Sequence, residues 1–210
     1  LQSKFEIRCK DQRVIPVPLN IPDRRPNINK HQGLVIGFVG RIHSERGLNK
    51  FVELATKAFQ LNPSARFDII GSGEEQFWLK NQLERSIPKG KINFVGQLSG
   101  SEYFKALGNL DILCSVAPSE SYGRVAREAL ALGVSVVATH SAGIDELSES
   151  LPRGTIHFLP DVLEIDEVKR ILHSAVETKV PSDLLEFFLE SNKRNISDLI
   201  ESWQEMVQNV

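Results

Sequence analysis

The sequence predicts an α/β fold whose core is a Rossmann-like, doubly wound parallel sheet of about six strands. Short apolar runs rich in β-branched residues alternate with amphipathic segments over most of the 210 residues. The runs are continuous rather than alternating in polarity, which is typical of strands buried on both faces. Regular alternation of such strands with helices favours parallel pairing through right-handed crossovers.

The expected strands follow one another along the chain at residues 34–39, 67–70, 92–95, 111–114, 135–138 and 155–159. The first helix between them is expected to bury a face made of Leu48, Phe51, Val52, Ala55 and Phe59. The same periodicity predicts a second helix with an apolar face of Phe77, Leu79 and Leu83. It also predicts a later one with a face of Val125, Ala129 and Leu132.

The final segment, residues 181–210, has helical patterns and no expected strand. An apolar stretch at 184–189 precedes a helical stripe formed by Ile196, Leu199, Ile200, Trp203 and Val207. We expect most of this stripe to pack onto its own domain.

The pattern divides the chain into three parts. Residues 1–32 are expected to be a linker or interdomain segment, because Pro16, Pro18, Pro22 and Pro26 prevent a regular helix or central strand. Residues 33–180 form the ligand-binding domain, and residues 181–210 form the C-terminal helices. The chain begins with Leu1 rather than methionine, so we expect it to be a piece of a longer protein.

Composition narrows the class of partner. A net charge of -2 and a pI near 6.3 argue against a nucleic acid or an anionic membrane as partner. The sequence has no apolar run of the ~20 residues that span a bilayer, and no secretory signal. Its two cysteines, Cys9 and Cys114, lack the spacing of a disulfide framework or zinc site. We expect a cytoplasmic protein, or one peripheral to the membrane in its full-length form.

In a sheet of this kind ligands bind beyond the carboxyl ends of the strands. The loop after the first strand runs from Gly40 to Gly47 and carries Arg41 and Arg46, whose guanidinium groups can bind phosphate oxygens in bidentate fashion. The alternative is that both arginines are solvated surface residues. The loop after the second strand has Gln76 where a dinucleotide fingerprint needs its third glycine, which argues against an NAD enzyme.

The segment from residue 118 to residue 130 contains two glutamates, Glu120 and Glu128, that enclose seven residues. If a helix begins near Ser121, the two carboxylates lie about 12 Å apart along its axis. The backbone amides of residues 122–124 would then be unpaired donors of the first turn. This order of carboxylate, amides and carboxylate matches the sugar hydroxyls, diphosphate and ribose of a nucleotide-sugar. Alternatively, Glu120 is a helix cap and Glu128 a solvated helix residue.

The five histidines, including His43 and His140, show no metal-ligand spacing. No metal or other cofactor is therefore expected.

Taken together, these segments resemble the retaining glycosyltransferases of family 4, which have the GT-B fold. The matching text is Gly40-Arg41, Glu45-Arg46-Gly47, Ile70-Gly71-Ser72-Gly73, Ile92-Asn93-Phe94-Val95-Gly96, Asp111-Ile112-Leu113, Glu120 to Glu128, Ala129-Leu130-Ala131-Leu132-Gly133, and Gly143 with Glu146. Their order and spacing hold from about Val14 to Leu159. The resemblance implies that residues 33–180 are the nucleotide-sugar donor-binding domain, which is the C-terminal domain of such an enzyme.

The resemblance also implies roles for single residues. Arg41 and Arg46 would stabilise the departing donor diphosphate, with Arg46 in a position where the family usually has lysine. Glu120 would contact the transferred sugar, and Glu128 would accept hydrogen bonds from the ribose hydroxyls. The backbone of Leu98 would contact the base. The remaining expected substrate contacts are Gly73, Ser121, Tyr122, Gly123, Arg124 and Val125.

Three positions depart from the family pattern. Tyr122 stands in place of a common phenylalanine, and Ser135 in place of a common proline before the fifth strand. Ala142 and Gly143 replace a glycine pair.

The implied activity is transfer of a hexose from a UDP-, GDP- or ADP-sugar to a hydroxyl acceptor, with retention of configuration. The partners are the donor and an N-terminal acceptor domain, to which nothing in this chain corresponds. The stripe ending in Trp203 resembles a helix that packs on that domain, and without the domain we expect the chain to be inactive. Two alternatives stay open: a sugar-nucleotide epimerase of the same fold, and a non-catalytic nucleotide-binding module.

Overall fold

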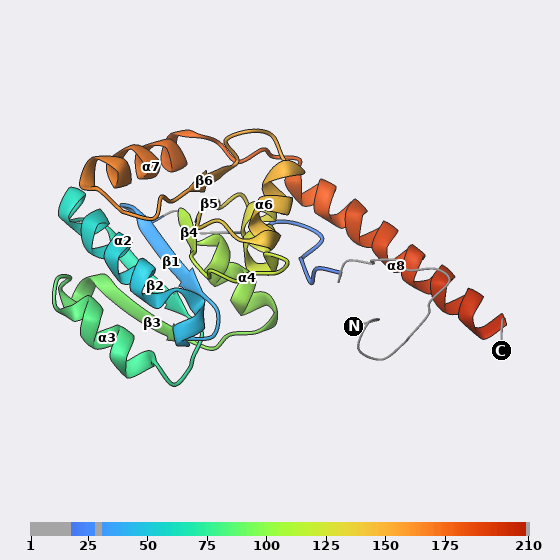
Figure 1. Ribbon diagram of the computed structural model, residues 1–210, viewed down its shortest axis with the longest axis horizontal. Coiled ribbons are helices and arrows are strands. Elements are labelled where there is room, and N and C mark those ends of the chain that lie inside the picture. Colours follow the sequence, from blue (N-terminus) through green and yellow to red (C-terminus); the bar gives the residue numbers. More distant parts are fainter. Residues whose placement is uncertain (1–17, 28–30, 209–210) are drawn as a thin grey trace.

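A computed structural model of the chain describes residues 18–27 and 31–208. The strands of these residues form one parallel sheet in the order β3-β2-β1-β4-β5-β6 (Figure 1). Their bounds are β1 Val35–Val39, β2 Arg66–Ile70, β3 Ile92–Gly96, β4 Ile112–Ser115, β5 Ser135–Ala138 and β6 Ile156–Phe158. Each predicted strand is found within one residue at either end, and the predicted fold class is confirmed.

The strand order reverses beside β1, which pairs with β2 on one side and with β4 on the other. Ile36 of β1 lies opposite Phe67 of β2 and Ile112 of β4. The loops that follow β1 and β4 therefore leave the same edge of the sheet and run toward opposite faces. Such a reversal creates a crevice at the carboxyl ends of the strands.

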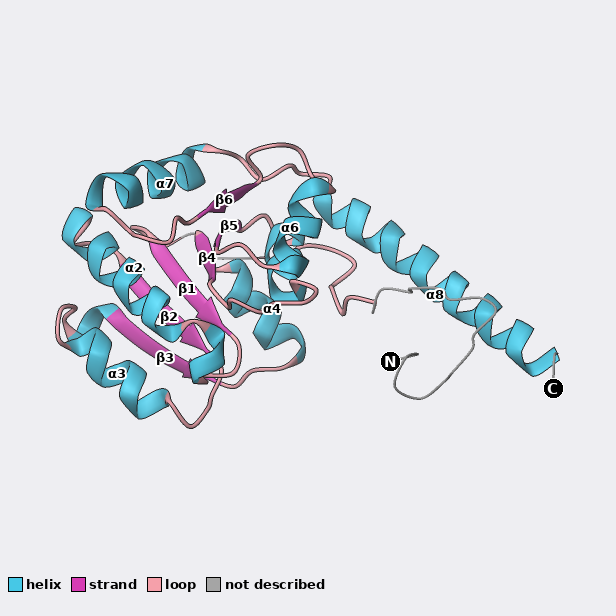
Figure 2. Cartoon of the chain, viewed as in Figure 1, coloured by secondary structure: helices cyan, strands magenta, loops and turns pink. Residues whose placement is uncertain are grey.

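Helices cover both faces of the sheet (Figure 2). One face carries α2 Leu48–Leu61, α3 Gln76–Glu84 and α7 Ile165–Glu177. The other face carries α4 Gly100–Gly108, α5 Arg124–Ala131, α6 Ala142–Glu149 and the first turns of α8 Leu184–Gln208. Two short 3₁₀ helices, η1 Ser44–Arg46 and η2 Lys89–Lys91, lie in the connections.

Each face of the sheet has its own hydrophobic core. Phe51 of α2 and Phe67 of β2 are fully buried in the first core, and Leu130 of α5 is fully buried in the second.

The predicted apolar face of α3 was partly wrong. Leu79 and Leu83 are buried as expected, but Phe77 is 76% exposed. Phe77 precedes Leu79 by two residues, or about 200° around a helix, so the two side chains point in opposite directions.

The C-terminal segment is one helix, α8, whose start is fixed to the body of the fold. Leu184 and Phe188 are buried in the second core. One turn further on, Asn192 accepts a hydrogen bond from the Leu19 amide (2.8 Å) and donates one to the Leu19 carbonyl (2.6 Å). These contacts tie α8 to the segment that leads into the domain.

Beyond Asn192, α8 extends away from the sheet and its covering helices (Figure 1). The stripe residues Ile196, Leu199, Ile200 and Trp203 are all exposed. The expectation that most of the stripe packs onto its own domain was therefore wrong for these four residues. The side chain of Val207 lies outside the described residues.

Ser135, which stands at the start of β5 where the family pattern has proline, makes hydrogen bonds that proline could not make. The Ser135 hydroxyl donates to the Ala175 carbonyl at 2.6 Å, and its amide donates to the Asp111 carbonyl at 3.2 Å.

Among the helices of the described segments, none has the length and apolarity needed to cross a lipid bilayer.

Candidate functional site

Two adjoining cavities lie at the carboxyl edge of the sheet and share Val39 and Val125 in their walls. The larger is a cleft of about 630 Å³, and we call it the main cleft. Its walls are formed by Asn20, Val39, Gly40, Arg41, Ile70, Gly71, Ser72, Gly73, Gln97, Leu98, Ser99, Gly100, Tyr103, Phe104, Arg124, Val125 and Glu128. The smaller, of about 20 Å³, lies between the ends of β1 and β4 and is large enough for about one water molecule.

The structure divides the predicted site residues between these cavities. Those in the wall of the main cleft are Arg41, Gly73, Leu98, Arg124, Val125 and Glu128. Those in the wall of the small cavity are Arg46, Glu120, Gly123 and Val125. Ser121 and Tyr122 line neither cavity.

Arg41 is one of two arginines that line the main cleft. Its side chain is 65% exposed and its Nη2 lies 3.9 Å from Oε2 of Glu45, four residues later. An exposed pair of this kind contributes little to stability, so Arg41 can exchange Glu45 for another anion at small cost.

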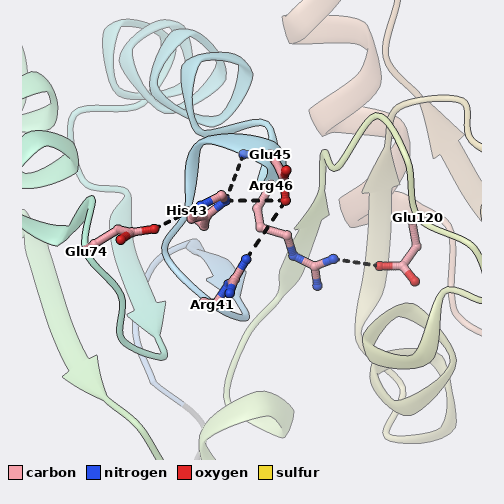
Figure 3. Close-up of polar contacts among 6 residues, drawn as sticks. All are labelled: Arg41, His43, Glu45, Arg46, Glu74 and Glu120. Atoms are coloured by element: carbon pink, nitrogen blue, oxygen red, sulfur yellow. Dashed lines mark hydrogen bonds and ion pairs between the residues drawn. The ribbon is translucent and has the colours of Figure 1, made fainter.

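Arg46 and Glu120 form the ion pair of the small cavity (Figure 3). Nη1 of Arg46 donates to Oε2 of Glu120 at 3.3 Å, and both side chains are mostly buried. The pair joins the loop after β1 to the loop after β4 across the crevice of the sheet.

Glu120 also bonds to the backbone of the loop that precedes α5. Its Oε1 accepts from the amides of Tyr122 (3.3 Å) and Gly123 (3.0 Å). Gly123 is in the left-handed conformation (φ 71°), and α5 starts at Arg124. The expected start near Ser121 was therefore wrong, because the left-handed Gly123 interrupts the helical conformation before Arg124. The amides of residues 122 and 123 already have a partner in Glu120, so the amides available to a ligand are those of the first turn of α5, from Arg124 onward.

Glu128 lines the main cleft and is almost fully buried, with 4% of the residue exposed. The alternative that it is a solvated helix residue was wrong. Its Oε2 accepts a hydrogen bond of 2.5 Å from the Tyr103 hydroxyl, and its Oε1 lies 3.9 Å from Nε of Arg124. Burial raises the pKa of the Glu128 carboxyl, whereas the Tyr103 hydrogen bond and the charge of Arg124 act to lower it.

Tyr122 packs away from both cavities, against Arg127. The Arg127 guanidinium lies 4.3 Å from the centre of the Tyr122 ring, and its Nε donates to the Tyr122 carbonyl at 3.0 Å. Nη2 of Arg127 also lies 3.5 Å from Oε1 of Glu146, which connects α5 to α6. These contacts brace the loop that carries Glu120.

The loops after β1 and β2 are joined through His43 (Figure 3). Nε2 of His43 lies 2.9 Å from Oε1 of Glu74, and its Nδ1 accepts from the Glu45 amide. At Gly73 a side chain would place its Cβ 2.2 Å from the carbonyl oxygen of Ile42. The glycine that borders the main cleft is thus also required for contact between the two loops.

Sequence reasoning missed Tyr103 and Arg127. Each contacts a predicted site residue: Tyr103 contacts Glu128, and Arg127 contacts Tyr122. Tyr103, however, lies 25 positions from Glu128 and on a different helix. No spacing rule relates two such positions, and the sequence holds no signal for the contact beyond the polar group of Tyr103 on a helix with an otherwise apolar buried face.

Residues 21–178 match the family described as glycosyl transferases group 1. The sulfoquinovosyl transferase SQD2 of Arabidopsis thaliana is 31% identical over 154 residues, which cover 71% of this chain and 28% of that protein. The chain spans about a third or less of the length of the curated relatives it matches.

Solved structures share the fold. WaaG, a glycosyltransferase involved in lipopolysaccharide biosynthesis, superposes with a TM-score of 0.65 at 16% identity, over 92% of this chain and 54% of that one. The Anabaena protein HepE in complex with UDP and glucose has a TM-score of 0.65 at 19% identity, over 81% of this chain and 48% of that one.

Proposed function

This chain belongs to the glycosyl transferases group 1 family, and we propose that it is the donor-binding, C-terminal domain of a retaining, family 4 enzyme. The substrate would be a hexose carried on UDP, GDP or ADP, and the acceptor a hydroxyl. Support for a nucleotide-sugar comes from HepE, a structure of the same fold that holds UDP and glucose. The proposal extends to the whole enzyme, of which an N-terminal acceptor domain would be the other half.

The observation that carries the proposal is the set of charged residues that line the main cleft. Arg41 and Arg124 supply cations, and Glu128 supplies a buried acceptor, around one space of about 630 Å³. That volume is within the range of small-molecule sites. A diphosphate requires cations, and a ribose diol requires an acceptor that can bind two hydroxyls, which a carboxylate is.

The proposed orientation of the donor follows from the two cavities. The nucleoside lies in the main cleft, with its base beside Leu98 and its ribose at Glu128. The diphosphate then lies toward Arg41 and the start of α5, and the sugar points to the mouth of the small cavity, where Glu120 is. Departure of the diphosphate develops negative charge, which Arg41 and Arg46 would stabilise electrostatically.

The small cavity imposes a condition on this mechanism. A hexose is far larger than a space of about 20 Å³, so the sugar can meet Glu120 only at the mouth of that cavity. Both Glu120 oxygens already have partners, Arg46 on one side and the Tyr122 and Gly123 amides on the other. Contact with the sugar therefore adds to these bonds or displaces Arg46, which would then be free to face the diphosphate.

Calorimetric titration of the chain with UDP, GDP, ADP and their hexose derivatives tests the proposal. We expect one nucleoside diphosphate to bind in the presence of EDTA, since the arginines supply the positive field that a metal would otherwise provide. The matching nucleoside should bind more weakly. Binding that requires magnesium or manganese, or no binding by any member of the panel, would overturn the proposal.

Transfer itself is expected to need the second domain. Acceleration of a two-substrate reaction depends on holding both reactants together, an advantage of up to about 7–11 kcal/mol. We expect this chain to bind donor without producing a glycosylated acceptor, and activity to return when the N-terminal domain is added.

A further inference from the structure

We propose that Tyr103 is a positioning residue that orients the Glu128 carboxylate and makes the main cleft selective for a ribonucleotide. The proposal rests on the function proposed above, in which Glu128 receives the ribose. Tyr103 lies on α4 and Glu128 on α5, so the contact joins two helices that both line the main cleft.

The Tyr103 ring is held in place independently of its hydroxyl. It packs edge-on against Phe104 with the ring centres 5.1 Å apart, and it adjoins the second hydrophobic core. The hydroxyl projects from this fixed ring and donates to Oε2 of Glu128 at 2.5 Å. A short bond from a fixed donor defines the direction of the carboxylate plane.

The orientation decides what Glu128 presents to a ligand. With Oε2 bonded to Tyr103, Oε1 and the second lone pair of Oε2 are the acceptor sites left for a ligand in the main cleft. Nε of Arg124 stands 3.9 Å from Oε1, beyond a hydrogen bond, and its side chain is exposed and free to move aside. The remaining acceptor sites suit the adjacent hydroxyls of a ribose, of which a 2′-deoxyribose supplies one fewer.

The Tyr103 hydroxyl also favours the charged form of Glu128. A buried carboxyl tends to take up a proton, and burial does raise the pKa of Glu128. Among the described residues, Tyr103 on α4 and Arg124 on α5 are the groups that oppose this rise. Burial and the neighbouring Glu128 charge raise the pKa of Tyr103 itself, so its hydroxyl stays protonated and able to donate.

Loss of the Tyr103 hydroxyl should raise the pKa of Glu128. Tyr103→Phe removes one of the two effects that lower the Glu128 pKa, so the pKa rises further above its ordinary value. Acceptance from ribose by the ionised carboxylate is lost as the pH falls through that pKa. The pH below which ribonucleotide affinity declines should therefore be higher in the variant than in the native chain.

The test compares Tyr103→Phe with the native chain in two measurements. Calorimetry gives the affinity ratio of ribonucleoside to 2′-deoxyribonucleoside diphosphate at pH 7.5 and the pH profile of the ribonucleotide. NMR titration of the labelled Glu128 carboxyl carbon gives its pKa without any nucleotide. The matched control is Ser135→Ala, which also removes a hydroxyl bonded to a buried acceptor but lies at the opposite edge of the sheet.

We expect Tyr103→Phe to lower the affinity ratio about 10-fold, as for loss of a hydrogen bond to a charged group. The pH midpoint and the Glu128 pKa should both rise by about one unit. Ser135→Ala should change none of these values, although it lowers the melting temperature.

Two different failures are distinguishable. A native chain that binds no nucleoside diphosphate would refute the proposed function and this inference with it. A native chain that selects ribose, with an unchanged ratio and pH midpoint in Tyr103→Phe, would refute the inference alone. Tighter ribonucleotide binding by the variant would also refute it, because Tyr103 would then compete with ribose for Glu128.

Discussion

At the scale of single residues, Arg41 and Glu128 differ in how their surroundings prepare them for a ligand. Arg41 is exposed, and its ionic contact with Glu45 is long. Glu128 is buried, and its carboxylate is oriented by the hydrogen bond from Tyr103. Burial also raises the pKa of this carboxyl. A mobile cation can follow a flexible diphosphate, whereas a fixed acceptor can discriminate between rigid sugars.

Arg41→Ala should weaken binding of a nucleoside diphosphate by at least about 10-fold, because charge-assisted hydrogen bonds contribute about 1.5–3 kcal/mol each. Binding of the corresponding nucleoside should change much less, and calorimetry with both ligands measures the difference. Arg170→Ala is the matched control, since Arg170 is equally exposed but lies on α7 and pairs with Glu167. Equal losses for nucleoside and diphosphate would remove Arg41 from the phosphate role.

Glu128→Gln should abolish most of the preference for a ribonucleotide over its 2′-deoxy form. A carboxylate accepts from both ribose hydroxyls, whereas the amide offers one acceptor oxygen and a donor group. Tyr103 can still donate to that single oxygen, which leaves less for the ligand. Competition binding of the two nucleotides measures the preference, and its absence in the native chain would contradict the role given to Glu128.

At the scale of elements, strands were easier to predict than the start of α5. Each strand is buried on both faces, so its apolar run is visible in the sequence. Helix α5 starts at Arg124 because Gly123 before it is left-handed (φ 71°). The loop before it is held by Glu120, which binds the amides of residues 122 and 123 and pairs with Arg46, 74 positions earlier. A glycine in a loop can take many conformations, so the left-handed conformation of Gly123 was not predictable from the sequence.

Helix α8 provides an element-scale prediction. Asn192→Ala removes two hydrogen bonds with the Leu19 backbone and should lower the free energy of unfolding by about 1–3 kcal/mol, measured by urea denaturation. Asn195→Ala, one turn further along the same helix, is the control and should have a small effect. Nucleotide affinity should be unchanged in Asn195→Ala, because α8 does not line the main cleft. An unchanged stability in Asn192→Ala would contradict the anchoring of α8 described here.

At the scale of the whole molecule, the sequence predicted the sheet, its layers and the edge that holds the candidate site. It did so because alternating buried strands and helices allow few topologies. The division of the site into two cavities was not predictable, since it results from the Arg46–Glu120 pair between loops of different strands. The exposed stripe of α8 was also mispredicted, because an apolar periodicity does not reveal which surface covers it.

The central claim is that a nucleoside diphosphate binds in the main cleft, between Arg41 and Glu128. Backbone amide NMR spectra recorded while the diphosphate selected by calorimetry is added test this most directly. We predict that the largest shifts occur at Gly40, Gly71, Leu98 and Val125, and that amides at the opposite edge of the sheet, such as Asn109 and Gly133, stay unchanged. Shifts concentrated at the opposite edge, or saturable binding without shifts around the main cleft, would contradict the claim.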